Sequence, residues 1–221
     1  MTTSPPPFML PMQNPPWMLV RIALETRHHH TQADEDRLTL MDACSPAEYR
    51  AFLARTYGFE SVVEAAMVGI PGPVGALVAS RAKTALLRQD LEALGVKPAE
   101  LDQLPRCTTV KVIATPSQAL GYLFVLERHT LLAGLIRRQL ARRLPAEIKA
   151  ASRYLAAYGG SPGLHLRQLG DALGAQARIA ANAPSRIVTA ANEVFRSQRQ
   201  WYLASGSFPA ASHDRRVRWA G

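Results

Sequence analysis

The sequence predicts an all-α fold, a single domain of about seven or eight helices joined by short turns rich in Gly and Pro. Hydrophobic residues make up 48% of the 221 residues, whereas aromatic residues make up only 7%. Ala and Leu predominate among the hydrophobic residues, and this balance favours helices over strands. Apolar residues also recur at helical spacing between the breaks, which indicates helices with one buried face.

The length is that of one domain, which we expect at residues 17–204. Residues 1–16 contain six prolines and no charge, so we expect a disordered lead-in that cannot form a helix. This segment lacks the charged start and the unbroken apolar stretch of a signal peptide. Residues 205–221 are interpreted as a flexible basic tail, with Arg215, Arg216 and Arg218 near its end.

The chain is basic, with 26 Lys and Arg against 17 Asp and Glu and a formal charge of +9. Such a charge favours anionic partners, but no helix-turn-helix signature or aromatic–basic interleaving is visible, which argues against nucleic acid. Cys44 and Cys107 form no disulfide framework and no zinc spacing, so we expect a reducing cytoplasm. No run of about 18 uncharged apolar residues is found, so we expect no membrane span.

The first helix is expected from Trp17 to about Met41, with a bend near Asp34–Asp36. The second should cover Pro46–Met67. Ser45 is a typical N-cap, a proline occupies the first helical position, and Glu48 lies in the first turn.

A third helix is predicted for Val74–Leu94, because Gly95 occupies the usual position after a helix end. Residues Lys97–Thr115 are expected to form a connector. Within it, Thr108–Ala114 is locally strand-like, but a single strand has no partner in this sequence.

The most strongly helical segment is Ser117–Leu144. Its last turns carry positive charge, which suits the negative end of the helix dipole. The residues concerned are Arg137, Arg138, Arg142 and Arg143. Three further helices are predicted at Pro145–Tyr158, Leu164–Leu173 and Pro184–Tyr202.

Three consecutive histidines, His28 to His30, interrupt the first helix. They cannot share one face, because each residue advances a helix by about 100°. The face of His30 holds Thr26, Ala33 and Asp34, and small residues there are typical of packing against something flat. Asp34 lies one turn after His30, so its carboxylate could accept the imidazole N–H and leave the other nitrogen for a metal. A packed structural histidine and an internal histidine tag remain the alternatives.

The segment from Thr26 to Asp34, Thr-x-x-x-His-Thr-Gln-Ala-Asp, resembles the proximal-helix signature of haem oxygenases. Other segments resemble the bacterial, biliverdin-producing branch that is associated with phytochromes, and they follow its order over Val20–Tyr202. Its second helix is matched by Ser45–Phe52, the start of its distal helix by Ala119–Glu127, and its closing helices by Tyr154–Gly159 and by Ala191–Phe195 with Trp201.

This resemblance implies a haem oxygenase-like bundle in which two helices hold a haem between them. His30 would be the proximal iron ligand, Asp34 would orient its imidazole, and Thr26 and Arg27 would belong to the same haem-binding helix. Haem would be both substrate and cofactor, and O₂ activated at the iron would attack a meso carbon. The implied products are biliverdin, carbon monoxide and Fe²⁺, with electrons from an external reductase or ferredoxin.

The chain departs from the family after Glu127. The family motif Gly-Ser-x-Leu-Gly-Gly is replaced by the segment from Arg128 to Ala133, followed by Gly134. Glycine there allows close backbone approach. Arg128 and Leu132 would place side chains where haem or oxygen should lie, and His129 stands where a small or acidic residue would manage a water network.

Three interpretations of this departure remain open. In the first, the helix shifts, Ala133 and Gly134 line the haem, and activity survives with Arg128 and His129 as candidate catalytic residues. In the second, His129 is a second axial ligand of a haem binder or sensor. In the third, side chains fill the pocket and haem does not bind. His129 also has apolar neighbours at helical spacing, as a packed core histidine would.

The resemblance further implies basic residues that hold the haem propionates. Ala23 and Leu24 occupy the expected early positions, so Arg21, Arg27 and Arg167 are the substitutes considered, with solvated charges as the alternative. The tryptophan that often follows the Tyr-Gly turn is replaced by Leu164-His165. The sequence therefore supports a haem oxygenase, with a non-catalytic protein of the same fold, binding haem, another tetrapyrrole or a protein, as the alternative.

Overall fold

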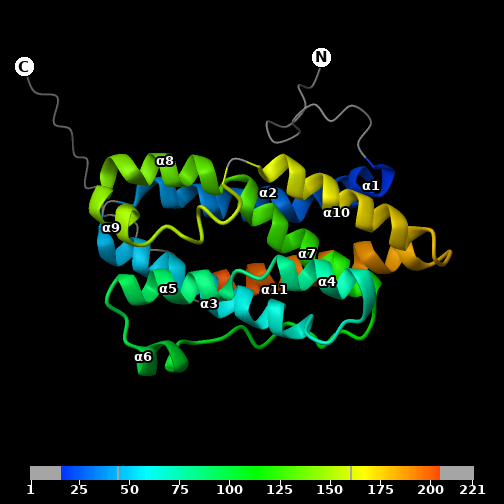
Figure 1. The fold of residues 1–221 in the computed structure, drawn as a ribbon, viewed down its shortest axis with the longest axis horizontal. Helices are drawn as coiled ribbons and strands as arrows, with labels where there is room; N and C mark the ends of the chain where they lie inside the picture. Colours follow the sequence, from blue (N-terminus) through cyan, green and yellow to red (C-terminus); the bar gives the residue numbers. More distant parts are fainter. Residues whose placement is uncertain (1–15, 44, 160, 205–221) are drawn as a thin grey trace, which may run out of the picture.

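The computed structural model describes residues 16–43, 45–159 and 161–204, and the helices in these ranges form an elongated bundle (Figure 1). No strand occurs among the described residues, which confirms the all-α prediction. Cys44 and the predicted lead-in and tail lie outside the described residues, except for Pro16. The elements are α1 (Trp17–Glu25), α2 (Arg27–Leu38), the 3₁₀ turn η1 (Thr39–Asp42), α3 (Pro46–Ala66), α4 (Gly72–Ser80), α5 (Thr84–Ala93), α6 (Pro98–Gln103), α7 (Pro116–Leu131), α8 (Ala133–Arg143), α9 (Pro145–Ala150), α10 (Pro162–Ala177) and α11 (Ala183–Ala204).

The first predicted helix is divided at Thr26, rather than bent near Asp34–Asp36. Thr26 has φ −105° and ψ 4°, outside the helical range. Its hydroxyl donates to the Ile22 carbonyl at 2.7 Å, a local bond through which Thr competes with regular helix geometry. The break leaves His30 in the first turn of α2, because α2 begins at Arg27.

The predicted helix Val74–Leu94 is two helices, α4 and α5, because a side chain from α3 caps the second one. The Glu64 carboxylate accepts hydrogen bonds from the backbone N–H groups of Lys83 (2.7 Å) and Thr84 (3.1 Å), and from the Thr84 hydroxyl (2.6 Å). A cap supplied from a distant helix leaves no local signal in the sequence.

Further boundaries differ from the prediction, since α6 lies within the predicted connector and α10 extends beyond Leu164–Leu173 at both ends. The segment Ser117–Leu144 is broken at Leu132, between α7 and α8. The segment Pro145–Tyr158 is helical only to Ala150, as α9. Beyond it the Asp90 carboxylate accepts from the backbone N–H groups of Arg153 (2.9 Å) and Tyr154 (2.8 Å), which holds this stretch in turns.

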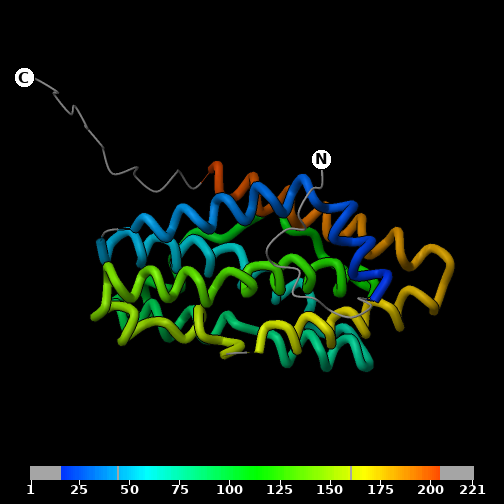
Figure 2. Tube along the Cα trace, turned by 90° about the horizontal axis from the view of Figure 1, so that it is seen from above, coloured from blue at the N-terminus to red at the C-terminus, as the bar shows by residue number. Residues whose placement is uncertain are grey.

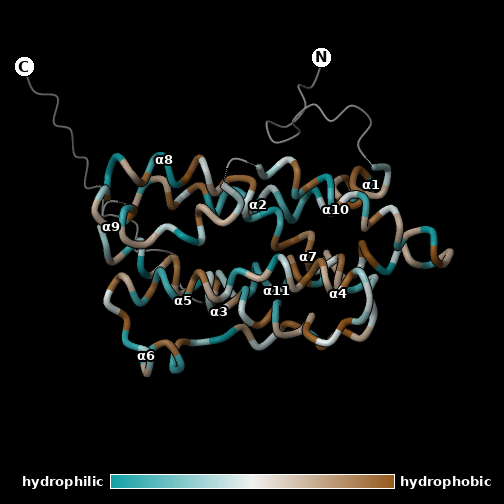
Figure 3. The backbone as a smooth tube through the Cα atoms, viewed as in Figure 1, coloured by the Kyte–Doolittle hydropathy of each residue, from teal (hydrophilic) through white to brown (hydrophobic). Residues whose placement is uncertain are grey.

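The buried apolar side chains form two separate cores. The first core joins α1, the end of α3, α4, α10 and α11 around the apolar part of α7, and the second joins η1, the start of α3, α5, α8 and α9. In Figure 3 brown residues follow α7, whereas teal residues gather on α8. Among the described residues, Pro116–Arg143 is the stretch long and apolar enough to cross a membrane, but 78% of its apolar window is buried, as in a core helix.

A layer of polar residues separates the two cores. We call it the polar layer and define it as Arg37, Glu60, His129, Tyr154 and Gln198, each of which is at most 4% exposed. Both α3 and the α7–α8 pair pass from one core to the other, and each carries one of these residues at the crossing. The polar layer therefore lies between the two cores, and Arg37 extends it onto α2, the helix that carries His30.

Helices α7 and α11 cross in close contact at Gly121. A Cβ atom on Gly121 would lie 2.4 Å from the Ile187 carbonyl oxygen and 2.8 Å from the Ala190 Cβ. Seen from above, α1 and α2 follow the same side of the bundle as α11 (Figure 2), which they contact. The glycine of the Ala119–Glu127 motif therefore serves contact between α7 and α11.

We predict that Gly121→Ala lowers the free energy of unfolding by about 1–3 kcal/mol, because the added methyl group collides with backbone that cannot move freely. Gly134→Ala is the matched control. A Cβ there meets no atom within 4 Å, so this change should raise stability by up to about 1 kcal/mol through helix propensity. Urea unfolding measures both, and equal effects of the two changes would contradict the assigned crossing.

Candidate functional site

His30 is buried on α2 and lies beside α7 and α11. Its exposed fraction is 4%, and its ring meets the Phe195 ring edge-on, with 6.5 Å between centroids. Burial, followed by the positive charge of Arg128, lowers the pKa of His30 to about 4. The imidazole is therefore uncharged at neutral pH, the state in which histidine binds metals.

Arg128 on α7 reaches across to Asp34 on α2. Its Nη2 donates to the Asp34 carboxylate, and the two side chains are only 6% and 14% exposed. This ion pair joins two residues that are 94 positions apart in the chain. Its acidic member, Asp34, lies one helical turn after His30. Asp34 is thus placed next to the candidate ligand, and in this structure its carboxylate is engaged by a guanidinium from the facing helix.

Burial acts on both members of this pair. It raises the pKa of Asp34 even though Arg128 acts in the opposite direction. It also lowers the pKa of Arg128, again against the effect of its partner. The attraction therefore does not fully offset the loss of solvation, as is common for buried ion pairs.

His129 is held in the polar layer by both ring nitrogens. Nδ1 lies 2.7 Å from Glu60 Oε1, and Nε2 lies 2.7 Å from Gln198 Nε2. Burial, then Arg37, lowers the pKa of His129, so the ring is neutral, with Nδ1–H donating to Glu60 and Nε2 accepting from Gln198. This arrangement is that of a packed core histidine, and iron ligation by His129 would require one of these bonds to break.

Glu60 and Arg37 are the buried charges at the centre of the polar layer. Tyr154 donates its hydroxyl proton to Glu60 Oε1 at 2.5 Å, and Arg37 Nη2 donates to the Tyr154 oxygen at 3.4 Å. The Arg37 guanidinium also lies 5.4 Å from the centre of the Phe52 ring. Burial alone would raise the pKa of Glu60, but the bond from His129 and the charges of Lys83 and Arg37 lower it below its ordinary value.

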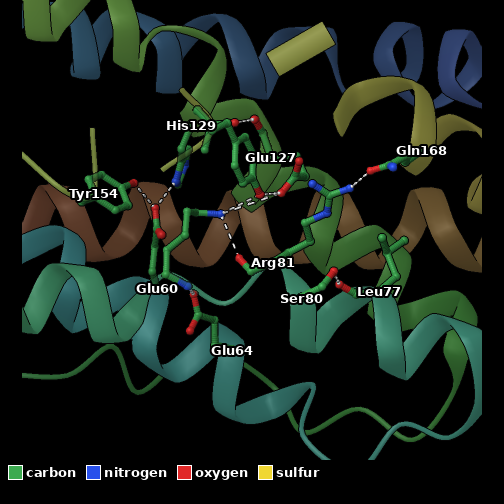
Figure 4. A network of polar contacts seen from close by, with 12 residues as sticks. Glu60, Glu64, Leu77, Ser80, Arg81, Glu127, His129, Tyr154 and Gln168 are labelled. Atoms are coloured by element: carbon green, nitrogen blue, oxygen red, sulfur yellow. Dashed lines mark hydrogen bonds and ion pairs between the residues drawn. The ribbon is translucent and has the colours of Figure 1, made fainter. Parts of the chain in front are cut away.

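A second polar cluster anchors α7 just before the divergent segment (Figure 4). The Glu127 carboxylate accepts from the Tyr158 hydroxyl and lies 3.8 Å from Lys83 Nζ, with both members of that ion pair at most 3% exposed. Arg81 donates to Gln168 on α10 and lies 5.5 Å from the Tyr158 ring centre. This cluster fixes α7 against the connection between α4 and α5.

The remaining candidates on α7 and α8 are placed differently from one another. Leu132 is the residue at the break and packs against the second core, and Ala133 is buried in that core. Gly134 is exposed in the first turn of α8, with nothing within 4 Å of an added Cβ. The structure thus brings Arg128 to His30 and Asp34, and places Gly134 in open space.

The arginines considered as partners for the haem propionates lie mainly at the surface. Arg27 and Arg167 are exposed, and Arg21 pairs with Glu25 at 2.6 Å, with both side chains more than a third exposed. Thr26 is fully buried, and its hydroxyl bonds to the preceding turn, so its part in the motif is to shape the start of α2.

Sequence reasoning missed Arg37, Glu60, Lys83 and Gln198. One signal was available for Glu60, which lies three residues after Tyr57 and three before Val63 on the apolar stripe of its helix. A carboxylate on a buried face requires compensating partners. The identity of those partners depends on tertiary contacts that no local pattern reports.

We predict that Glu60→Gln lowers the free energy of unfolding by about 3–5 kcal/mol, because it leaves Arg37 buried without its compensating charge. The control is Glu193→Gln, which removes an exposed ion pair with Lys111 (2.9 Å, 26% and 69% exposed). This change should cost at most about 1 kcal/mol. Similar losses in urea unfolding would show that Glu60 contributes no more than a surface charge.

The cost of Glu60→Gln should also depend on pH. The folded-state pKa of Glu60 lies below the ordinary value of 4.5, so the ionised group contributes stability above that pH and loses it as pH falls through the folded pKa. We therefore expect the deficit of the variant to be full near neutral pH and to shrink towards acid. Stability curves recorded across pH check this, and a deficit that grows below pH 4.5 would contradict it.

Comparison with protein families identifies the chain. The family model described as Heme oxygenase matches residues 18–204, a range that runs from the second residue of α1 to the end of α11 and includes the residues around His30. Searches of curated proteins and of solved structures found no match. Because the match covers most of the sequence, the chain belongs to the haem oxygenase family.

Proposed function

We propose that the protein binds haem between α2 and α7, with His30 as the proximal iron ligand, and cleaves it oxidatively to biliverdin, carbon monoxide and Fe²⁺. Membership of the haem oxygenase family supports a haem-degrading function in general. The observation that carries the specific proposal is the buried, uncharged His30 imidazole in the first turn of α2. Asp34, one turn later, is the group that would orient that imidazole.

Iron, when haem is bound, supplies the site at which O₂ is activated. The polar layer is our candidate for proton supply. Four of its buried atoms, Arg37 Nε and Nη1, Glu60 Oε2 and Gln198 Oε1, have no hydrogen-bond partner within the described part of the chain. Buried polar groups are nearly always satisfied, and ordered internal water is the usual partner. Water held there would place exchangeable protons next to His129.

The two sides of the site do not fit haem equally well. The α2 side fits, because His30 is neutral and buried. The α7 side does not fit in the arrangement described, because the Arg128 side chain spans to Asp34. This observation favours a second candidate function, in which the protein binds haem or another tetrapyrrole without degrading it.

We further propose that the electron donor is an acidic ferredoxin or reductase, and that the protein works in the bacterial cytoplasm in the biliverdin-producing branch. The net charge of +9 supports an acidic partner. The exposed arginines of α8 supply a basic surface for it, namely Arg137, Arg138, Arg142 and Arg143. The motif order that resembles this branch supports the assignment to it.

We predict that hemin added to the purified protein gives a sharp haem absorption band, and that His30→Ala abolishes this band. His28→Ala is the matched control, since His28 is an exposed neighbour on the same helix and should leave the spectrum unchanged. Absorption titrations with hemin measure both. A wild-type protein that shows no band with excess hemin, or a band that survives His30→Ala, would remove the proposed ligand.

Reduction of the hemin-loaded protein in air separates the two candidate functions. A haem oxygenase should convert the haem band to those of verdohaem and then biliverdin, with release of carbon monoxide. A haem-binding protein without turnover should retain a haem spectrum. The reaction is followed with a chemical reductant, so that the identity of the natural electron donor does not affect the outcome.

A further inference from the structure

The residue that most distinguishes this site is Arg128. It occupies a position where the resembling motif has glycine, and its guanidinium on α7 bonds to Asp34 on α2. Its side chain is only 6% exposed, so it cannot be regarded as a solvated arginine that happens to point inwards. The fold instead directs it at the carboxylate next to the candidate ligand.

The pair is well suited to open and close. The pair is a single contact at the partly exposed Asp34 carboxylate, whose side chain is 14% exposed, whereas that of Arg128 is 6% exposed. The helices that it ties also meet in the polar layer, where Arg37 of α2 bonds to Tyr154 and Tyr154 shares Glu60 Oε1 with His129 of α7. Opening the pair therefore leaves the rest of the bundle in place.

We propose that the Arg128–Asp34 ion pair is a latch that ties α2 to α7, and that haem enters between these helices only when the pair breaks. This inference rests on the proposed function, because it assumes that haem binds between these helices. Arg128 is then a specificity-determining residue of this chain. It lowers the fraction of molecules that are competent to bind, and the apparent affinity for haem falls by that fraction.

Two substitutions separate the ion pair from the mere bulk of the side chain. Arg128→Ala removes both the charge and the volume, whereas Arg128→Met removes the charge and keeps most of the volume in a helix-compatible side chain. The control is Arg88→Met, which removes an arginine from the exposed Arg88–Glu92 pair (3.1 Å) on α5. Circular dichroism verifies that each variant is folded.

The measurement is the rate at which the haem band appears after rapid mixing with hemin. We expect Arg128→Ala and Arg128→Met each to bind hemin about tenfold faster than the wild type and the Arg88→Met control. Equal rates for the wild type and Arg128→Met would overturn the latch, even if Arg128→Ala were faster, because bulk alone would then explain the effect.

A double-mutant cycle supplies a readout that does not depend on haem chemistry. Thermal unfolding of Arg128→Met, Asp34→Asn and the double variant gives the coupling between the two residues. We expect coupling in the protein without hemin and its loss in the hemin-bound protein. Coupling that persists unchanged with hemin bound would overturn the latch.

These outcomes distinguish the latch from the proposed function. A wild-type protein with a His30-dependent haem band, and variants that bind at the same rate, would leave the haem site in place and remove only the latch. Failure of the wild type and of both Arg128 variants to bind hemin would remove the haem site, and with it the latch.

Discussion

The Glu60 carboxylate is the constraint around which the bundle is arranged. A single oxygen, Oε1, accepts from the Tyr154 hydroxyl and lies in hydrogen-bond contact with His129, which in turn contacts Gln198. Four segments far apart in the sequence, from α3, α7, α11 and the turns after α9, therefore meet at one buried charge. Because an uncompensated buried carboxylate is costly, these segments cannot slide past one another without losing several bonds together.

The polar layer also explains how α2 is positioned. Arg37, near the end of α2, is fully buried, and it bonds to Tyr154 and lies over the Phe52 ring. One turn earlier Asp34 pairs with Arg128, and one turn before that His30 packs on Phe195. Contacts at three successive turns fix both the rotation and the depth of the helix. The direction in which His30 faces is thus determined by its own contact with Phe195 together with the contacts of Asp34 and Arg37.

The sequence was sufficient for the fold class and for the approximate helices, because these depend on composition, periodicity and local capping. The capping box at Ser45 and Glu48 is one example, since both of its bonds are formed as the sequence predicts. The breaks inside the longer predicted helices could not be predicted in this way. Glu64 and Asp90 create two of them by capping segments about 20 and 60 residues away, and such contacts leave no local pattern.

In the candidate site, too, local sequence patterns predicted some features, whereas others depend on tertiary contacts. Periodicity placed His30 and Asp34 on one face of a helix, and the structure brings them together with Arg128. The pairing of Asp34 with Arg128, and the enclosure of His129 by Glu60 and Gln198, depend on how α2, α3, α7 and α11 meet, which no single segment specifies.

The presence of Arg128, where the resembling motif would place glycine, bears on how the two helices could approach a ligand. Glycine allows the helix backbone itself to approach a ligand closely. A glycine has no side chain that could block the site when the ligand is absent. An arginine keeps the backbone away, but its long side chain can bond to Asp34 in one state and withdraw in another. A buried guanidinium is costly unless an opposite charge is paired with it. Asp34, one turn after His30, provides that partner, and under the proposed latch the same carboxylate would close the site in one state and orient the imidazole in the other.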